Sequence, residues 1–454
     1  MEGYLIYSII FSVVASVFYL NIVYFRNRRR KDLKRLPDAA IGHPMAQHPQ
    51  IDEALCMGCG SCAAACPEGD VLGIVYGKAK MLNPLRCVGH GECATACPVG
   101  AIQIGLGDSH LRNDLPVLDE TLQSSVEGMY IAGELGGLSL VHNAVRQGKG
   151  VIENIAASPL RSGDSRVKDV AIIGAGPAGL SAALAAEAHN LSYLVLEQYD
   201  IGGSILQFPK RKLVMMQPFE LPIVGKLANS EYSKEDLLTI WQKIAKAYKL
   251  RILTGQRVHR IQKKKELFQI RATDGDVLAR HVLLAIGRRG SPKKLDVPGE
   301  KQAKVAYQLV DPAAYRNRRI LVIGGGDMAV ETAISLAKQP GNRVVISYRK
   351  SKFFRIRKQN QKKIETLIQE KKVLAIFNSN VVEIKKKSVL IKSKKKVAEI
   401  PYDDVFIMIG GIPPFQMLKE MGIAFGGEQN RGLLRVRESR QTSASQKRRE
   451  VSMN

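Results

Sequence analysis

No cysteine follows Cys97, although 357 residues remain after it in this 454-residue chain (454 − 97). A redox-active pair of the C-x-x-C type is therefore excluded from that long C-terminal part. The seven cysteines are an odd number, which fits poorly with a complete set of disulfide bonds. Thiol chemistry is thus confined to a short N-terminal region.

Acidic residues are scarce as well: the chain has 42 Asp and Glu residues and 68 Lys and Arg residues, which gives a net charge of +26. Much of the basic excess lies in 26–35, 349–372 and 385–396. Basic surfaces attract acidic lipids and acidic proteins such as ferredoxins or flavodoxins, although a solvated face without any partner is an equally good interpretation. No nucleic-acid-binding motif accompanies the charge, so nucleic acid is not predicted as a partner.

All seven cysteines fall in an internal repeat of 31 residues. The first copy has the spacing C-x2-C-x2-C-x3-C-P, and the second copy has a histidine in place of one cysteine. Thiolates at this spacing hold cubane iron–sulfur clusters, and the small residues between them permit close backbone approach. Zinc sites rarely use such a run, so zinc is the weaker interpretation. The candidate metal ligands are Cys56, Cys59, Cys62, Cys66, Cys87, His90, Cys93 and Cys97.

Residues 45–106 resemble a bacterial two-cluster ferredoxin, which has a small α+β fold. In those proteins the cysteine before proline ligates the other cluster. The resemblance implies that cluster I, of the 4Fe-4S type, takes Cys56, Cys59, Cys62 and Cys97. It implies that cluster II takes Cys66, Cys87 and Cys93, with His90 at the fourth iron. There are two alternatives to ligation by His90: the fourth iron could lack a protein ligand, or the cluster could hold only three irons.

A first dinucleotide-binding unit is predicted at 168–198. A short apolar strand, Val170–Ile173, runs into a G-x-G-x-x-G fingerprint and an Ala-rich helix, and a second strand, Tyr193–Leu196, ends at an acidic residue. The glycines permit a tight turn and close approach of a pyrophosphate, and the acid holds ribose hydroxyls. The weaker alternative is a glycine-rich turn in an unrelated α/β fold. The candidate residues are Gly174, Gly176, Gly179 and Glu197.

A second unit is predicted at 319–350, with strands at Ile320–Ile323 and Arg343–Ser347. No carboxylate follows the second strand, where an NAD ribose would be held. Basic residues at that place, together with Arg355, could pair with a 2′-phosphate, which favours NADPH over NAD. The alternative is that they belong to a solvated basic face. The candidate residues are Gly324, Gly326, Ala329, Arg349 and Lys350.

Residues 282–300 and 403–414 resemble the crossover segments of two-dinucleotide flavoproteins, and 167–434 resembles the thioredoxin-reductase-like branch of that family. The resemblance implies an α/β, Rossmann-like FAD-binding domain at 167–296 and an NAD(P)-binding domain at 297–414. A C-terminal segment and basic tail follow at 415–454. The resemblance implies the fold and the cofactors, whereas the missing dithiol leaves the electron acceptor open.

The family normally closes with a further FAD-binding strand, a Gly-Asp pair and a helix, and no such segment follows the second crossover. Residues 112–158 resemble it: a strand at Met129–Ala132 precedes Gly133 and Glu134, and a helix is predicted at 139–156. The order is thus permuted, which is tolerable because chain ends lie close together in many domains. The alternative is an ordinary strand and helix unrelated to FAD.

Residues 4–25 carry no charge and are long enough for a transmembrane helix. The basic linker at 26–44 begins with seven basic residues and one acidic residue in 26–35. Because positive residues stay inside, this pattern predicts a single-pass protein of the cell membrane whose body faces the cytoplasm. An amphipathic helix lying on the membrane surface is the alternative.

These features predict a membrane-anchored, FAD-dependent NAD(P)H oxidoreductase with two 4Fe-4S clusters and an unknown acceptor, either a soluble carrier or a membrane component. Electrons could run in either direction. No side chain is required as a catalytic acid or base, because hydride and electron transfer belong to the cofactors. The alternative is an electron-carrier or redox-sensing subunit of a larger membrane complex. The oligomeric state stays open, with a homodimer as one option.

Overall fold

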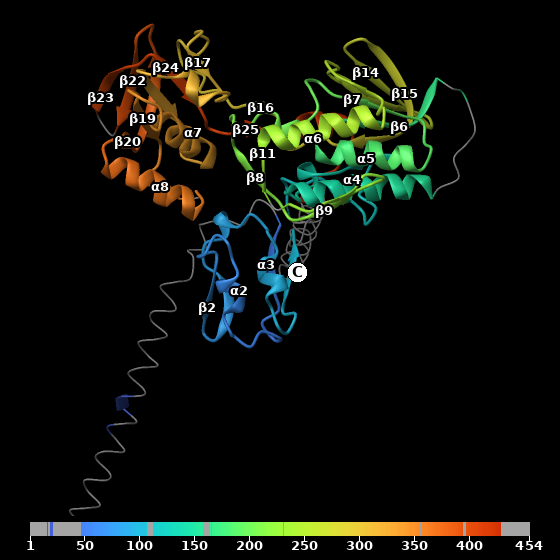
Figure 1. Cartoon of the computed structure of the whole chain (residues 1–454), viewed down its shortest axis with the longest axis horizontal. Helices are drawn as coiled ribbons and strands as arrows, with labels where there is room; N and C mark the ends of the chain where they lie inside the picture. Colours follow the sequence, from blue (N-terminus) through green and yellow to red (C-terminus); the bar gives the residue numbers. More distant parts are fainter. Residues whose placement is uncertain are drawn as a thin grey trace, which may run out of the picture. The chain divides into compact units, whose positions relative to one another are not determined.

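The computed structural model describes residues 47–106, 112–157, 164, 166–229, 231–354, 356–393 and 396–427, together with Ser16, Tyr19 and Leu20. The predicted linker at 26–44, most of the predicted transmembrane helix at 4–25, Arg355 and the tail after 427 lie outside these residues. In the part that is described, no helix is both long and apolar enough to cross a membrane. The chain divides into two compact units, the smaller formed mainly by 47–106 and the larger mainly by 112–427 (Figure 1).

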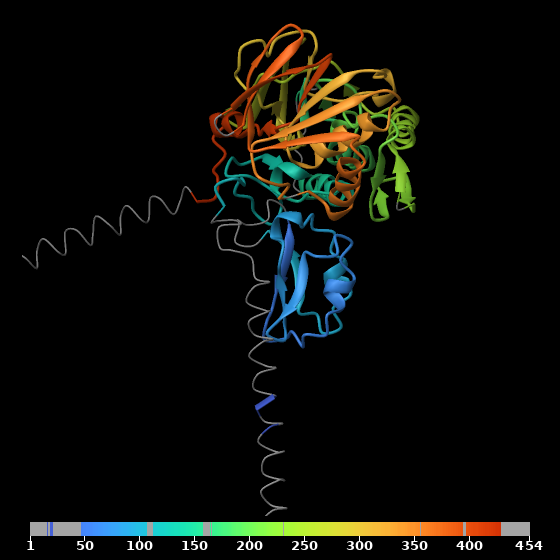
Figure 2. The same ribbon diagram turned by 90° about the vertical axis from the view of Figure 1, so that its left-hand side faces the viewer.

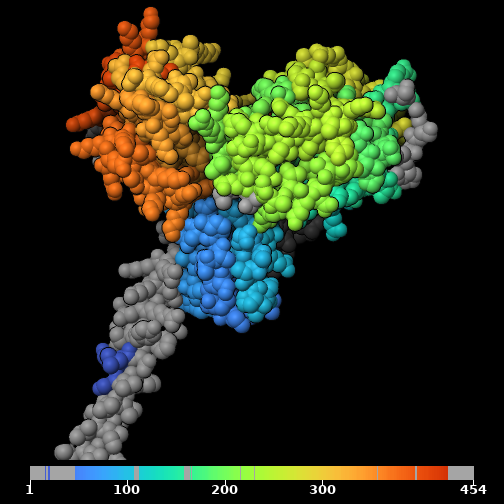
Figure 3. Space-filling model, viewed as in Figure 1, coloured from blue at the N-terminus to red at the C-terminus, as the bar shows by residue number. Residues whose placement is uncertain are grey.

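The smaller unit is an α+β fold of two antiparallel strand pairs and two short helices, coloured blue in Figures 1 and 3. β1 pairs with β4 from His48↔Gly105 to Ile51↔Ile102, so the two ends of the unit meet. β2 and β3 form the other pair. The elements are β1 (His48–Ile51), α2 (Ser61–Ala64), β2 (Leu72–Val75), β3 (Lys78–Met81), η2 (Pro84–Arg86), α3 (Glu92–Thr95) and β4 (Ile102–Gly105).

The two halves of the smaller unit repeat one backbone conformation 31 residues apart. Gly58 and Gly89 have φ angles of +74° and +75°. A Cβ atom on Gly58 would lie 2.1 Å from the carbonyl oxygen of Gly77, and one on Gly89 would lie 2.6 Å from that of Gln47. Glycine is therefore required at both turns, and the repeat in the sequence is also a repeat in the structure.

The first α/β domain of the larger unit has a sheet with the strand order β12-β7-β6-β15-β14-β13. Neighbours from β12 to β15 are parallel, whereas β14 runs antiparallel to both of its neighbours, β13 and β15. The predicted strands at Val170–Ile173 and Tyr193–Leu196 are present, the first extended back to Val167. The elements are β6 (Val167–Ile173), α5 (Pro177–Ala188), β7 (Tyr193–Leu196), η5 (Gly203–Ile205), β8 (Leu213–Met215), β9 (Phe219–Leu221), β10 (Gly225–Leu227), β11 (Glu231–Ser233), α6 (Lys234–Ala247), β12 (Ile252–Leu253), β13 (Arg260–Lys264), β14 (Leu267–Ala272) and β15 (Gly275–Leu284).

A strand that precedes this domain in sequence, β5 (Met129–Ile131), is part of its sheet. β5 pairs in parallel with β15 from Val282↔Met129 to Leu284↔Ile131. After η4 (Glu134–Gly136), helix α4 (Val141–Ala156) packs on α5, and Figure 1 shows the two side by side. A Cβ atom on Gly148 of α4 would lie 2.0 Å from the carbonyl oxygen of Ala178, so this packing requires glycine. Side chains of these elements and of β6 share one buried core.

The second α/β domain has a fully parallel sheet with the order β17-β24-β18-β19-β20, which is orange to red in Figure 2. Between β20 and β24 the chain forms a separate antiparallel sheet of β21, β22 and β23. The predicted strands at Ile320–Ile323 and Arg343–Ser347 are present, each one residue longer. The elements are β17 (Val305–Ala306), η6 (Pro312–Ala314), β18 (Arg319–Ile323), α7 (Asp327–Ala337), β19 (Arg343–Tyr348), α8 (Lys358–Gln369), β20 (Val373–Phe377), β21 (Ser379–Ile384), β22 (Ser388–Ser393), β23 (Lys396–Pro401) and β24 (Asp404–Ile407).

Two short strands pair where the chain crosses between the domains, β16 (Ser291–Pro292) and β25 (Gly411–Ile412). After β25 the chain forms α9 (Phe415–Glu420), and Ile423 and Phe425 are buried in the core of the first domain. The first part of the C-terminal segment predicted at 415–454 is therefore a packed piece of that domain.

Candidate functional site

The eight candidate metal ligands of the smaller unit line two separate cavities. Site I is lined by Cys56, Cys59, Cys62 and Cys97, and its empty space is about 300 Å³, which includes space open to solvent. Site II is lined by Cys66, Cys87, His90 and Cys93, and its empty space, measured in the same way, is about 330 Å³. Cys97 therefore lies with the first copy of the repeat and Cys66 with the second, as expected if the cysteine before each proline ligates the other cluster. All seven cysteines are free thiols in the structure.

The lining of both cavities suits a polynuclear cluster, because four thiol or imidazole ligands surround each cavity and glycines keep the backbone between them close. Within the described residues, no three His, Cys, Asp or Glu side chains form a group that could hold a single metal ion.

Site I combines buried and exposed sulfur atoms. The Sγ of Cys56 accepts a hydrogen bond from the backbone N–H of Ala79 at 3.3 Å, and the Sγ of Cys97 accepts one from that of Ala101 at 3.3 Å. Cys59 is exposed, and its Sγ lies 3.4 Å from the hydroxyl oxygen of Ser61. The hydrogen bond from Ser61 lowers the pKa of the Cys59 thiol. Such donors stabilise negative charge on sulfur, whether in a thiolate or in a cluster.

None of the four candidate ligands of site II is exposed, and burial governs their pKa values. Burial, followed by repulsion from the neighbouring thiolates of Cys87 and Cys66, raises the pKa of Cys93 to about 11. Burial also raises the pKa of Cys87. It lowers the pKa of His90 and so favours the neutral imidazole, which is the form that binds metals.

The first glycine fingerprint forms a tight cradle at the end of β6. Gly174 has a φ of +105°, and a Cβ atom there would lie 2.7 Å from the carbonyl oxygen of Ala285. A Cβ atom on Gly179 would lie 1.9 Å from the carbonyl oxygen of Gly174. Gly176 is different, since its nearest neighbour would be 3.6 Å away, on Gly203. Two glycines therefore serve the turn and the helix contact, and Gly176 leaves room for a pyrophosphate.

Glu197 stands at the end of β7, as the fingerprint predicts, and its carboxylate is buried. One oxygen accepts a hydrogen bond from the backbone N–H of Ala175 at 2.7 Å, and the other accepts one from that of Tyr199 at 2.9 Å. The acid is thus fixed beside the glycine loop, where the hydroxyls of an adenosine ribose would be held.

The segment after β5 brings a second acid to the same domain. Gly133 has a φ of +84°, and its N–H donates to the side-chain oxygen of Gln147 in α4 at 2.8 Å. Glu134 is exposed, yet desolvation raises the pKa of its carboxyl, while Arg288 and Arg289 act in the opposite direction.

In the second fingerprint, too, one glycine is required by the turn and another leaves open space. A Cβ atom on Gly324 would lie 2.3 Å from the carbonyl oxygen of Met408, whereas one on Gly326 would meet nothing within 4 Å. Ala329 is buried at the packing position of the helix. Arg349 and Lys350 follow β19 and are exposed, so both are available to a 2′-phosphate. Arg355 lies outside the described residues.

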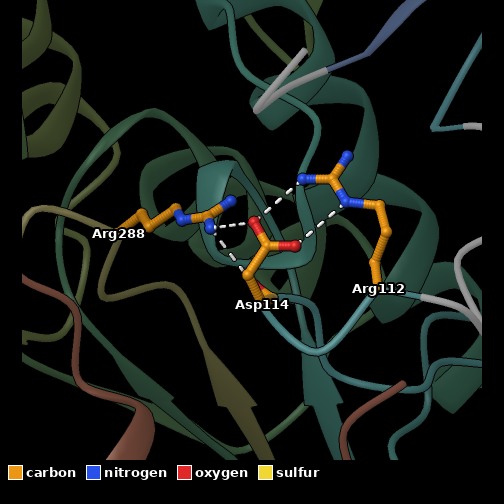
Figure 4. Close-up of polar contacts among 3 residues, drawn as sticks. All are labelled: Arg112, Asp114 and Arg288. Atoms are coloured by element: carbon orange, nitrogen blue, oxygen red, sulfur yellow. Dashed lines mark hydrogen bonds and ion pairs between the residues drawn. The ribbon is translucent and has the colours of Figure 1, made fainter. Parts of the chain in front are cut away.

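One charged cluster was not found from the sequence. Asp114 binds Arg112 and Arg288 together (Figure 4), and Arg288 lies in the crossover segment between the two domains. The two members of the second pair are 174 positions apart, so no local pattern could reveal it. The only signal in the sequence was the place of Arg288 in the predicted crossover at 282–300.

Comparison with known proteins identifies the same two parts of the chain. Residues 171–443 match the family model of the pyridine nucleotide-disulphide oxidoreductases, and residues 48–98 match that of the 4Fe-4S dicluster domain. A ferredoxin–NADP reductase of Ignicoccus hospitalis is 27% identical over 58% of this chain and 84% of its own length. A thioredoxin reductase of Bacillus subtilis is 30% identical over 57% of this chain and 79% of its own.

Among solved structures, the bacillithiol disulfide reductase Bdr (YpdA) from Bacillus cereus is 28% identical, with a TM-score of 0.53. It covers 57% of this chain, and 82% of its own length is matched. The first family model spans 273 of the 454 residues (443 − 171 + 1), which is more than half of the chain. The chain therefore belongs to the pyridine nucleotide-disulphide oxidoreductase family, as an NAD(P)H-dependent FAD oxidoreductase that also carries a 4Fe-4S dicluster domain.

Proposed function

We propose that this protein is a membrane-anchored oxidoreductase that relays electrons between NADPH, FAD and two 4Fe-4S clusters, with a one-electron carrier or a membrane component as acceptor. The observation that carries the proposal is the division of eight candidate ligands between sites I and II. Relatives named thioredoxin reductase suggest a disulfide substrate, but no cysteine follows Cys97. In this proposal the clusters replace a dithiol as the acceptor of electrons from the flavin, and the relative named ferredoxin–NADP reductase agrees with an iron–sulfur partner.

When bound, FAD and the clusters would supply the chemistry: the flavin would accept a hydride from NADPH and a proton from the solvent, and its two electrons would pass singly to the clusters with release of two protons. The chain's own residues bind and orient these groups. Gly176 and Gly326 admit the two pyrophosphates, and Glu197 holds the adenosine ribose of FAD. Arg349 and Lys350 select the 2′-phosphate of NADPH. No side chain of the chain is assigned as a catalytic acid or base.

We also propose that residues 112–158 are the FAD-closing segment of the family in a permuted position. The support is that β5 joins the sheet of the first domain in parallel with β15, and that α4 shares a core with α5. Gly133 and Glu134 then lie at the end of β5, where a Gly-acid pair of this segment would contact the flavin side of FAD.

The membrane anchor is the remaining part of the proposal. Its support is the uncharged stretch at 4–25 followed by the basic cluster at 26–35, which would keep the body of the protein in the cytoplasm. Fractionation of cells that express the full chain, compared with a chain beginning at residue 45, tests this part. Equal release of both into the soluble fraction would contradict the anchor.

The relay is tested by adding NADPH anaerobically to the detergent-purified holoprotein. Flavin absorbance and low-temperature electron paramagnetic resonance are followed together. Bleaching of the flavin accompanied by reduced-cluster signals is expected. Bleaching while both clusters stay silent would contradict the relay and would favour a subunit whose clusters serve another partner. An equal titration with NADH tests the preference that Arg349 and Lys350 predict.

A further inference from the structure

A short loop of the second α/β domain carries the two cations assigned to NADPH and one more. The loop leaves the sheet after Tyr348, the last residue of β19, and packs back against it at Phe353. Three of the four residues between them are basic, namely Arg349, Lys350 and Lys352, and all three are exposed. Among the ion pairs of the described residues, none includes any of these three. The loop thus presents three cations that no described carboxylate neutralises.

Aromatic rings and a backbone bond hold this loop against the sheet. Phe353 is buried and stacks on Tyr348, with 5.9 Å between the ring centroids and an angle of 15° between the ring planes. Its ring also meets that of Phe377 in β20 edge-on, at a centroid distance of 5.1 Å. The carbonyl oxygen of Lys350 accepts a hydrogen bond from the backbone N–H of Asn378 at 3.0 Å. Because packed rings and this bond fix it, the loop has a defined shape of its own.

The ring stack also places the loop beside the second glycine fingerprint. A Cβ atom on Gly325, the middle glycine of the three, would lie 2.4 Å from the ring of Tyr348. Only glycine permits the ring to lie this close. The next residue, Gly326, has open space where a pyrophosphate would lie. A nucleotide bound there brings its adenosine ribose to the end of β19, which is where the loop begins.

One further ring gathers two of the three cations. The side chain of Phe354 is 42% exposed, and the Nζ atoms of Lys350 and Lys352 lie over its ring, 5.1 and 5.6 Å from the centroid. Both distances are within the range of a cation–π interaction. Two like charges repel each other, and the electron-rich face of a shared ring offsets part of that repulsion. Phe354 therefore keeps the two ammonium groups together on the loop.

We propose that the loop is a preformed site for the 2′-phosphate of NADPH, in which Lys352 is a third binding residue and Phe354 a positioning residue. The inference deepens the proposed function and rests on it, since that function assigns only Arg349 and Lys350. A phosphate monoester carries about −1.5 to −2 charges at neutral pH, which suits a site of three cations. Its oxygens accept charge-assisted bonds from several cations at once, whereas the free 2′-hydroxyl of NADH has no charge to offer.

The test measures the binding of two nucleotides to the purified holoprotein by calorimetry. Adenosine 2′,5′-bisphosphate carries the 2′-phosphate and 5′-AMP lacks it, so the comparison isolates this group. The variants are Lys352→Gln, Phe354→Leu and Phe354→Tyr, of which the last keeps the ring. Lys419→Gln is the matched control, because it removes the same charge from beside a phenylalanine ring, that of Phe425 at 5.3 Å, in the first domain.

Wild-type protein is expected to bind the bisphosphate at least about tenfold more tightly than 5′-AMP. Lys352→Gln should weaken the bisphosphate about tenfold, because it removes a charge-assisted bond, and should leave 5′-AMP unchanged. Phe354→Leu should weaken the bisphosphate about threefold, as expected for an exposed cation–π contact, and Phe354→Tyr should bind it as the wild type does. Lys419→Gln should bind both nucleotides like the wild type.

A double variant shows whether the ring acts through the lysines. In a protein that already carries Lys352→Gln, Phe354→Leu should weaken the bisphosphate by less than it does alone, because one of the two ammonium groups is gone. Fully independent effects of the two substitutions would overturn the positioning role of Phe354. Equally weak binding in Phe354→Tyr and Phe354→Leu would overturn it too.

Bisphosphate binding that stays at the wild-type value in Lys352→Gln would overturn the third binding residue and leave the preference for NADPH intact. An equal loss for 5′-AMP in that variant would also overturn it, because a deformed nucleotide site affects both ligands. Failure of the proposed function is separately visible: wild-type protein that binds the two nucleotides equally overturns the preference for NADPH, and with it the roles of Lys352 and Phe354.

Discussion

Sites I and II descend from one repeat, and yet they offer a cluster different surroundings. Both use the same glycine turns and the same cysteine spacing. At the one position where the repeat breaks, site I has the exposed Cys59 beside a hydroxyl, and site II has the half-buried His90. The fold thus fixes two equivalent cradles, and single residues within them set the charge and the accessibility of each.

That difference suggests separate tasks for the two sites. A neutral imidazole in place of a thiolate leaves a cluster less negative, which raises its reduction potential. Site II should therefore hold an electron more firmly than site I. Site I has an exposed ligand, Cys59, and the exposed side chain of Met57 also lines it.

The largest expected effect comes from removing one buried ligand of each site. Cys62→Ala should abolish the cluster at site I, and Cys93→Ala should abolish the cluster at site II. Each substitution removes a thiolate ligand that the three remaining ligands of that site cannot replace. Iron content should fall from about eight to about four per chain in either variant. Iron and sulfide analysis with electron paramagnetic resonance measures this. Loss of all iron in both variants would show that the sites do not form independently.

The next effect concerns thiol reactivity in the iron-free protein. The pKa of Cys59 is lowered and that of Cys93 is raised to about 11, so at pH 8 Cys59 is far more often a thiolate. Relative to an ordinary thiol, Cys93 should react about a hundredfold more slowly with iodoacetamide, since each unit of pKa is a factor of ten. Peptide mass spectrometry over time gives the order in which the two cysteines are alkylated. In about 6 M urea the protein unfolds, and the two cysteines should then react at similar rates. If Cys59 still reacts faster in urea, the difference does not come from the folded environment.

Much of this comparison could be predicted from the sequence, because cluster ligands and glycine fingerprints are local. The 31-residue repeat located the eight candidate ligands, the resemblance to two-cluster ferredoxins divided them into two sets, and the strands around the two fingerprints form where the patterns place them. β5 was placed by resemblance, and its pairing with β15 required the structure. The remaining features depend on distant partners.

Two of those features show why local patterns were insufficient. Ile423 and Phe425 occur in a segment that becomes basic shortly afterwards, and only the fold shows that they are buried against the first domain. The pairing of Asp114 with Arg288 joins positions 174 residues apart, and neither residue has a distinctive local context. Burial and long-range ion pairs arise from the tertiary structure, which periodicity and spacing do not encode.

A reciprocal exchange at the position where the repeat breaks should reverse the order of the two potentials. His90→Cys is expected to lower the potential of site II by on the order of 100 mV, because the fourth ligand becomes anionic. Cys59→His should raise that of site I by a similar amount. Redox titration followed by electron paramagnetic resonance measures both. A site II potential that does not respond to His90→Cys would show that His90 is not a ligand.

The smallest expected effect tests the hydroxyl that distinguishes site I. Ser61 lies 3.4 Å from the Sγ of Cys59, whereas the matching position in the repeat, 31 residues later, is Glu92. Ser61→Ala removes a donor that stabilises the more negative, reduced cluster. The potential of site I should therefore fall by roughly 40 mV, the equivalent of about 1 kcal/mol for one electron. Ser61→Thr keeps the hydroxyl and should keep the potential, and site II serves as an internal reference within the same titration. If alanine and threonine shift site I equally, the hydroxyl has no electrostatic role, and the two sites then differ in their fourth ligand and their burial alone.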